Sequence, residues 1–336
     1  MPHVANLKMS MILRVPAVAH KSWLFSSSVC YELIFSLGLR HGVIRSISST
    51  EGQQSTSSSG FRNIEVMDVN RVRVIGLNRP RQRNAVNRQT AKELYSAFRL
   101  FDEDDSSDVA VLYGKGGTFC AGYDLKELAS ASTKNGGMDI NEFLQDCAAE
   151  TDVGPMGPSR LMLNKPVIAA VSGFAVAGGL ELALLCDMRV AEEDATFGVF
   201  CRRFGVPLID GGTVRLPALI GLSRALDMIL TGRPVLAQEA LAMGLVNRVV
   251  PRGNALNEAL VLANQIAAFP QACMRADRNS AYHSMYKTKD SSDKNKNWLK
   301  EGLSFEYSNG VSVIEKESVY GAQKFASGVG RKGKFD

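Results

Sequence analysis

The chain has 336 residues, of which 45% are hydrophobic and 22% charged, and its formal net charge is +5. This is the composition of an ordinary globular protein with ample material for a core. Five of the basic residues and one acidic residue lie in the first 50 positions, which leaves 34 basic and 33 acidic residues in the rest. A body so close to neutral lacks the basic excess that is typical of nucleic-acid binders.

The N-terminal segment, residues 1–50, has the composition of a mitochondrial transit peptide. It carries nine serines and a single acidic residue, Glu32. A secretory signal is the alternative, but no clean apolar block is followed by a small-residue cleavage site. Charged residues and serines interrupt its apolar runs, so we expect no membrane span and a location in the mitochondrial matrix. Residues 51–60, EGQQSTSSSG, predict a disordered polar linker.

The next part, residues 61–269, is predicted to be an α/β core. Short β-branched apolar runs predict buried strands at 64–69, 72–77, 109–113, 167–171 and 188–191. Apolar residues at three- and four-residue spacing, or Leu- and Ala-rich composition, predict helices at 90–102, 178–186, 223–230, 237–243 and 257–269. Alternating strands and helices indicate α/β organisation.

Two further segments have a less regular pattern. Residues 130–160 contain Ser, Gly, Asn and Pro clusters around one short helical pattern at 140–149, and predict a mobile flap. Residues 270–336 are predicted to form a mainly helical C-terminal region. The charged stretch 287–300 is interpreted as a solvated face.

Histidine and cysteine usage excludes several kinds of site. Only one of the four histidines, His283, lies beyond residue 50. This argues against a histidine-rich metal site and against a Ser-His-Asp or Cys-His hydrolase, so no metal site is predicted. The six cysteines include no C-x-x-C pair, which suits a reducing compartment with unpaired thiols.

The stretch 165–187 carries the first chemical signal. A buried strand is followed by an expected turn at 174–177, and then the Gly178–Gly179 pair opens an apolar helix. The N–H groups at the start of that helix would stabilise a developing oxyanion. Glu181, in its first turn, is the only acidic or basic residue between Lys165 and Asp187. An apolar setting should raise its pKa and suit it to proton transfer, although it could instead only satisfy the helix N-terminus.

A second motif gives this signal a family context. Residues 111–126 read VLYGKGGTFCAGYDLK, a strand, a Gly-rich turn and an F-x-A-G-x-D-L segment. With the later G-G-x-E segment this resembles the crotonase (enoyl-CoA hydratase/isomerase) superfamily. The resemblance begins near residue 64, includes NRPRQRNAVN at 78–87 and LTGRPVLAQEALAMGLVNRVV at 230–250, and fades after residue 282.

The resemblance implies a fold, a substrate and an assembly. The fold would be a crotonase-like spiral of ββα repeats, with C-terminal helices that pack across subunits in a homotrimer or hexamer. The substrate would be an acyl-CoA thioester, with coenzyme A as part of the substrate and no separate cofactor. The backbone N–H groups of Tyr123 and Gly178 would form the oxyanion hole. The CoA moiety would lie along the loops that hold Arg83, Ala85, Ala121, Asp124 and Leu125.

One position departs from the pattern of the hydratases in this superfamily. They use two glutamates that hold a water between them, and the position of the second holds Cys201, flanked by Arg202 and Arg203. A thiol with a reference pKa of about 8.5 is no water-activating base at neutral pH unless the arginines lower that pKa. Asp210 is the alternative second acid, or else an N-cap or turn residue.

These observations predict an acyl-CoA enzyme that stabilises a thioester enolate. Water addition to a 2-enoyl-CoA is the first expectation. A 3,2-enoyl-CoA isomerase that uses Glu181 alone is the second, because one base can move a proton from C4 to C2. A catalytically silent acyl-CoA binder is the third, and the missing glutamate is its supporting feature.

Overall fold

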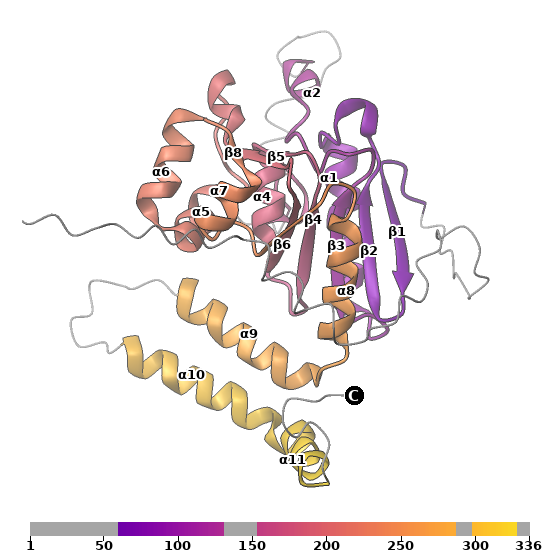
Figure 1. Ribbon diagram of the computed structural model, residues 1–336, viewed down its shortest axis with the longest axis vertical. Coiled ribbons are helices and arrows are strands. Elements are labelled where there is room, and N and C mark those ends of the chain that lie inside the picture. The colour runs from indigo at the N-terminus through magenta and orange to yellow at the C-terminus, as the bar shows by residue number, and fades with distance from the viewer. Residues whose placement is uncertain (1–59, 131–152, 287–297, 328–336) are drawn as a thin grey trace, which may run out of the picture. The chain divides into compact units, whose positions relative to one another are not determined.

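The computed structural model describes residues 60–130, 153–286 and 298–327 (Figure 1). The transit segment predicted at 1–50, nearly all of the linker and the helical pattern at 140–149 lie outside these residues. Within the described parts, no helix has both the length and the apolar character needed to cross a membrane.

The central sheet contains all of the predicted strands. β1 (Ile64–Val69) and β2 (Val72–Leu77) form an antiparallel hairpin. From β2 onward the neighbours are parallel, and the order is β1-β2-β3-β4-β6-β9. The remaining strands are β3 (Val109–Gly114), β4 (Val167–Val171), β6 (Met188–Glu192) and β9 (Arg248–Val250).

A second, three-stranded sheet corrects one sequence prediction. It has the order β5-β7-β8, formed by β5 (Phe174–Val176), β7 (Thr196–Gly198) and β8 (Val235–Leu236). The turn expected at 174–177 is therefore wrong for its first three residues. They become a strand because β7 pairs with them in parallel, a contact between segments that are distant in the chain.

The predicted helices are present, with their ends shifted. α1 begins at Arg88 rather than at residue 90, because the Asn87 side chain caps it by accepting a hydrogen bond from the Thr90 N–H at 2.9 Å. The core also contains α2 (Leu125–Ser130), α4 (Gly178–Leu185), α5 (Gly212–Ile220), α6 (Leu222–Thr231), α7 (Ala237–Ala242) and α8 (Ala255–Ala267), while α1 ends at Glu103. Short 3-10 helices lie at Pro80–Gln82, Pro158–Arg160 and Phe200–Phe204.

The inner strands of the central sheet, β2, β3, β4 and β6, are largely buried on both faces, as their continuous apolar runs indicate. Val74 and Val111 belong to a cluster with α8, which lies over β3 in Figure 1. Ile75 and Leu112 point the other way, into the larger core that contains α1 and α4. α4 is therefore embedded in the larger core, and all eight of its residues are buried.

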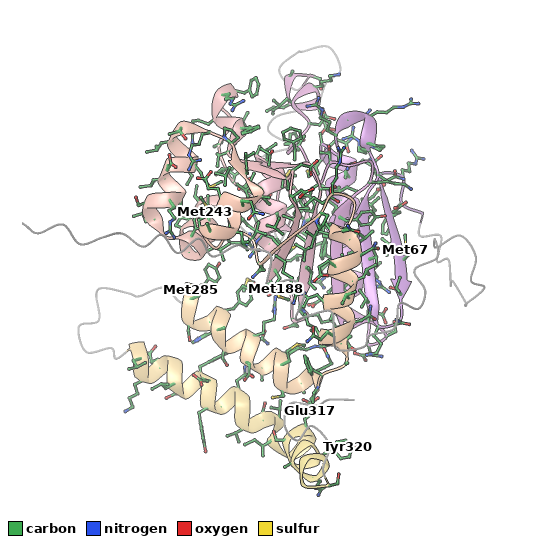
Figure 2. All side chains as sticks on the ribbon, viewed as in Figure 1. Met67, Met188, Met243, Met285, Glu317 and Tyr320 are labelled. Carbon is green, nitrogen blue, oxygen red and sulfur yellow. The ribbon has the colours of Figure 1, made fainter. Side chains whose placement is uncertain are left out.

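The C-terminal region is helical, as expected. α9 (Gln271–Tyr286) and α10 (Trp298–Val313) lie side by side, followed by a π-helical segment (Ile314–Ser318) and α11 (Val319–Ala326) (Figure 1). Glu317, labelled in Figure 2, accepts hydrogen bonds from the Ala272 N–H at 2.9 Å and the Cys273 N–H at 2.6 Å. A carboxylate at the N-terminus of α9 stabilises this helix, because its negative charge lies at the positive end of the helix dipole. Arg278 ties α9 to the core through Asp187 at 2.7 Å.

The C-terminus of α4 is held by a buried arginine, and this gives a stability prediction. Arg189, 3% exposed, donates from Nη1 to the carbonyls of Ala183 (3.2 Å) and Cys186 (2.7 Å), and from Nε to Leu245 O (2.7 Å). Arg189→Leu leaves these buried acceptors unpaired, so we expect urea unfolding to show a loss of about 3 kcal/mol or more. Arg252→Leu, at an exposed ion pair, is the control and should change little. Equal unfolding midpoints for the two variants would contradict this prediction.

Candidate active site

The two loops that carry the sequence motifs meet at one edge of the sheet. β3 and β4 are parallel neighbours, so the loops that follow them start side by side. The Cys120 N–H donates to Phe174 O at 2.8 Å, and the Val176 N–H donates to Cys120 O at 3.1 Å. A β-carbon added to Gly122 would lie 3.1 Å from the Gly178 nitrogen. The backbone next to Tyr123 therefore closely approaches the start of α4.

The Gly-Gly pair is required by packing at the start of α4. Ala177, the residue before it, has φ +54°, an uncommon conformation for a residue with a side chain. A β-carbon on Gly179 would overlap the carbonyl oxygen of Cys120, which is backbone and has no room to move aside. Glycine thus allows the N-terminus of a buried helix to lie directly against the other motif loop.

Glu181 lies one turn into α4 and is 2% exposed. Its Oε1 accepts hydrogen bonds from the backbone N–H groups of Asp210 at 2.9 Å and Gly212 at 2.8 Å. Burial, and then the charge of Asp210, raise its pKa to about 7. The raised pKa was expected from the sequence. The alternative, that Glu181 satisfies its own helix N-terminus, is wrong, because its Oε1 accepts hydrogen bonds from residues at the start of α5.

Asp210 is a second buried carboxylate in the same region, 3% exposed. Its Oδ1 accepts hydrogen bonds from the Met156 N–H at 3.0 Å and from the Ser159 hydroxyl. Burial is the main cause that raises its pKa. Its alternative role as an N-cap is wrong, because Gly211 is the N-cap of α5 and no side chain caps that helix.

The partners of Asp210 lie in a segment that the sequence predicted to be a mobile flap. Residues 131–152 of that segment are outside the described residues, but Gly154 to Ser159 are buried. Gly154 and Gly157 exchange backbone hydrogen bonds of 2.9 and 2.8 Å. This part of the predicted flap is buried, and Pro155 and Met156 form a wall of the site. The Gly-Pro-Met-Gly-Pro run was the available signal for a tight turn.

Cys201 lies in the 3-10 helix Phe200–Phe204 and is 9% exposed. Burial, and then the charge of Glu181, raise the pKa of its thiol. Arg202 donates from Nε to Ile229 O at 3.1 Å, and Arg203 lies over the ring of Phe200. The charge of Arg202 lowers this pKa, but burial and Glu181 outweigh it, so Cys201 is a neutral thiol at neutral pH and is ill suited to replace a carboxylate as a base.

The candidate catalytic groups line one cavity of about 260 Å³. Its walls include the three catalytic candidates Glu181, Asp210 and Cys201, with both expected oxyanion donors, Tyr123 and Gly178. Ala121 and Leu125, two of the five residues expected to bind CoA, also line it, and most of the remaining wall is apolar. In the described part of the chain, no group of three or more His, Cys, Asp or Glu side chains is placed to hold a metal ion.

The other expected CoA-binding residues lie outside the cavity lining. Arg83 is exposed, and its carbonyl accepts the Ala121 N–H at 3.1 Å. Arg79 forms an ion pair of 3.0 Å with Asp124 and also donates to the carbonyl of Ala85. Arg79, which the sequence analysis did not single out, thus ties the 78–87 loop to the segment that holds Asp124.

The comparisons with known proteins agree with this geometry. A family model described as enoyl-CoA hydratase/isomerase matches residues 68–319. The chain belongs to this family. It is 33% identical over 264 residues to a probable mitochondrial enoyl-CoA hydratase of Dictyostelium discoideum, covering 79% of this chain and 87% of that protein. It is 37% identical over 249 residues to a probable enoyl-CoA hydratase of Rhizobium meliloti, covering 73% and 87%.

Solved structures of the family share the fold. The crystal structure of an enoyl-CoA hydratase from Mycobacterium tuberculosis H37Rv superposes with a TM-score of 0.67 at 33% sequence identity. The match covers 79% of this chain and 96% of that one. The crotonase-like α/β fold expected from the sequence is thereby confirmed.

The raised pKa of Glu181 predicts a pH dependence of stability. The pKa of Glu181 is higher in the folded protein than its ordinary value of 4.5, so the folded state binds the proton more tightly than the unfolded state does. The protonated carboxyl therefore stabilises the fold at low pH. The free energy of unfolding should therefore fall as the pH rises from about 4.5 through about 7, by roughly 3 kcal/mol from this group. Glu181→Gln should remove that part of the slope in urea titrations at pH 5 and pH 8. Identical slopes for both proteins would contradict it.

Proposed function

We propose that this family member adds water to 2-enoyl-CoA thioesters, with Glu181 and Asp210 as its acid and base. The supporting observation is that two buried carboxylates from different elements line one cavity with the Tyr123 and Gly178 loops. Asp210 thus supplies the second carboxylate, which is missing at the position of Cys201. The names of the family relatives support the same chemistry.

The proposed mechanism uses the raised pKa values. The thioester oxygen accepts hydrogen bonds from the backbone N–H groups of Tyr123 and Gly178. Each donor contributes on the order of 3 kcal/mol to stabilising the enolate. Asp210 accepts a proton from the water that attacks C3. Glu181, with a pKa of about 7, is protonated in a large share of molecules at neutral pH and gives its proton to C2. Two neighbouring carboxylates that share one proton suit this division of roles.

Isomerisation is the second candidate function, and Cys201 is the observation that favours it. A single base, Glu181, would carry a proton from C4 to C2 of a 3-enoyl thioester. A silent acyl-CoA binder is less well supported. Burying both Glu181 and Asp210 costs folding free energy. A protein without catalytic activity would have no reason to keep two such carboxylates buried.

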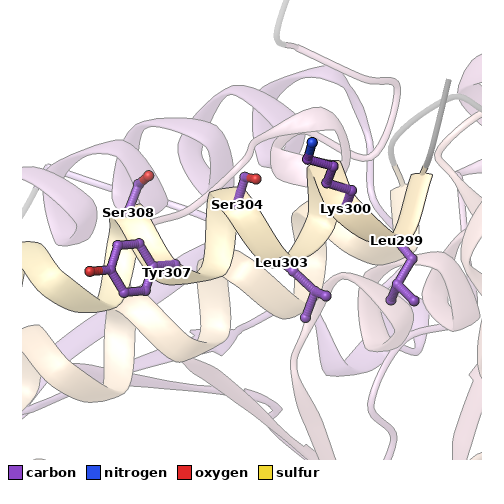
Figure 3. Close-up of a pocket in the computed structure, with 6 residues that line it drawn as sticks. All are labelled: Leu299, Lys300, Leu303, Ser304, Tyr307 and Ser308. Atoms are coloured by element: carbon purple, nitrogen blue, oxygen red, sulfur yellow. The ribbon is translucent and has the colours of Figure 1, made fainter.

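Location and assembly are part of the proposal. The composition of residues 1–50 and the mitochondrial name of the Dictyostelium relative support a matrix location. Figure 3 shows Leu299, Leu303 and Tyr307 on one side of α10, where they are 70%, 54% and 73% exposed. An apolar stripe at four-residue spacing suits contact with a second copy of the chain. We expect a trimer or hexamer by light scattering, with no cofactor beyond the CoA of the substrate.

Two substrates distinguish the candidate reactions. The full chain is incubated with crotonyl-CoA and with 3-hexenoyl-CoA while the absorbance of the conjugated enoyl thioester is followed. The proposal predicts loss of absorbance with crotonyl-CoA. A gain with 3-hexenoyl-CoA alone would assign the isomerase, and no change with either, despite tight CoA binding, would assign the silent binder.

A further inference from the structure

Cys201 differs from the other buried thiols in its surroundings. It lines the 260 Å³ cavity, whereas Cys120 and Cys186 do not. The thiol of Cys120 donates to Asn84 O at 3.1 Å, and that of Cys186 to Leu182 O at 3.5 Å. No hydrogen bond donated by the Cys201 thiol is found among the described residues. Its S–H is therefore available to a molecule in the cavity.

Glu181, a buried carboxylate, lines the same cavity as Cys201. Its negative charge acts on the Cys201 thiol and raises the pKa of that thiol. Glu181 is 2% exposed, and its Oε2 has no hydrogen-bond partner in the described part of the chain. Backbone N–H groups of Cys201 and Arg202 and the charge of Arg202 act on the sulfur in the direction that favours a thiolate.

The substrate proposed above is itself an electrophile. In a 2-enoyl thioester, C3 accepts nucleophiles because the carbonyl takes up the electron pair as an enolate. The same backbone N–H groups that serve hydration would stabilise that enolate. A thiol attacks such a carbon more readily than water does, because sulfur is the stronger nucleophile.

We propose that Cys201 adds reversibly to C3 of a 2-enoyl-CoA bound in this cavity and forms a thioether-linked acyl-CoA. The inference rests on the proposed function, because it needs a 2-enoyl thioester in the site. The S–C3 bond forms as the C2=C3 π bond breaks and its electrons move onto the thioester oxygen. The thiol proton passes to Glu181 and from there to C2. No oxidant, reductant or further reactant is involved, and the reverse steps release the enoyl-CoA.

This reaction makes the cavity a covalent site for α,β-unsaturated thioesters. The thiol and water compete for the same carbon, so the adduct holds acyl-CoA in the site and slows turnover. A saturated acyl-CoA has no electrophilic carbon at C3 and would bind without a bond. Cys201, at the position where a second glutamate was expected, would thus act as a nucleophile toward the substrate.

Intact-mass spectrometry of the acid-quenched full chain tests this inference. After incubation with crotonyl-CoA we expect one added acyl-CoA per chain, mapped by peptide analysis to Cys201, and none with butanoyl-CoA. Cys201→Ala should abolish the adduct. Glu181→Gln should slow its formation on the order of 100-fold, because the proton relay is lost. Cys273, a half-buried thiol outside the cavity, is the internal control and should stay unmodified.

Each outcome separates this inference from the proposed function. Hydration without an adduct on Cys201 would overturn the covalent step and leave the hydratase proposal intact. Modification of Cys273 in place of Cys201 would also overturn it, as a sign of reaction at a thiol outside the cavity. An adduct on Cys201 without hydration would support this inference and contradict the hydratase. Peptide mapping of the unmutated chain decides the question even where a variant fails to fold.

Discussion

Replacing Glu181 with glutamine is expected to lower kcat for crotonyl-CoA hydration on the order of 1000-fold, because the proton donor to C2 is lost. The amide oxygen of glutamine can still accept the N–H groups of Asp210 and Gly212, which Oε1 now accepts. The fold and the affinity for acyl-CoA should therefore change little. Initial rates followed by absorbance, with calorimetric binding of butanoyl-CoA, give both quantities.

Glu239→Gln is the matched control for this experiment. Glu239 is a carboxylate on α7 that pairs with Arg233 at 2.7 Å, and it does not line the cavity. Its replacement should leave kcat within a factor of about two, as expected of a surface ion pair. A Glu181→Gln protein that hydrates as fast as this control would remove Glu181 from the mechanism.

Asp210→Asn is expected to reduce hydration on the order of 100-fold, because the base that takes the proton of water is lost. Asparagine keeps a carbonyl oxygen for the Met156 N–H and the Ser159 hydroxyl, so the wall of the site should stay in place. Isomerisation of 3-hexenoyl-CoA needs one base only, and any such activity should persist. Rates with both substrates, measured on the same preparation, distinguish loss of a base from loss of the fold.

Asp227→Asn, at an exposed ion pair with Arg233, provides the control for Asp210. Full hydration by Asp210→Asn would mean that Glu181 acts without a second carboxylate. Equal loss of hydration and isomerisation would mean that Asp210 holds the site together and moves no proton.

The local pattern of the sequence was sufficient for five of the six strands of the central sheet, and only β9 was not predicted. The run at 167–171 is β-branched, apolar and bounded by Pro166 and Gly173, and β4 has those limits. β5 could not be predicted in the same way. Its three residues become a strand only because β7 and the Cys120 loop pair with them, and such pairing leaves no local signal.

The candidate site was predictable in its residues and less so in its connections. Glu181 was found as an acidic residue in an apolar run, and Asp210 as the alternative second acid once the resemblance placed Cys201 at the expected glutamate position. Asp210 is held by Met156 and Ser159, which lie 54 and 51 positions away in the chain. Neither residue carries a charge, so no spacing pattern in the sequence points to them. The direction of the pKa shift of Cys201 could not be predicted from the sequence for a similar reason. It depends on burial and on Glu181, whereas the sequence showed only the adjacent arginines.

A crystal structure of the full chain with a bound acyl-CoA tests the central claim most directly. The quantity to measure is the distance from the thioester oxygen to the backbone nitrogens of Tyr123 and Gly178. The account predicts that both are about 3 Å, with the Glu181 carboxyl beside C2. A thioester oxygen that lies away from both nitrogens, with its acyl chain outside the Glu181 cavity, would contradict it.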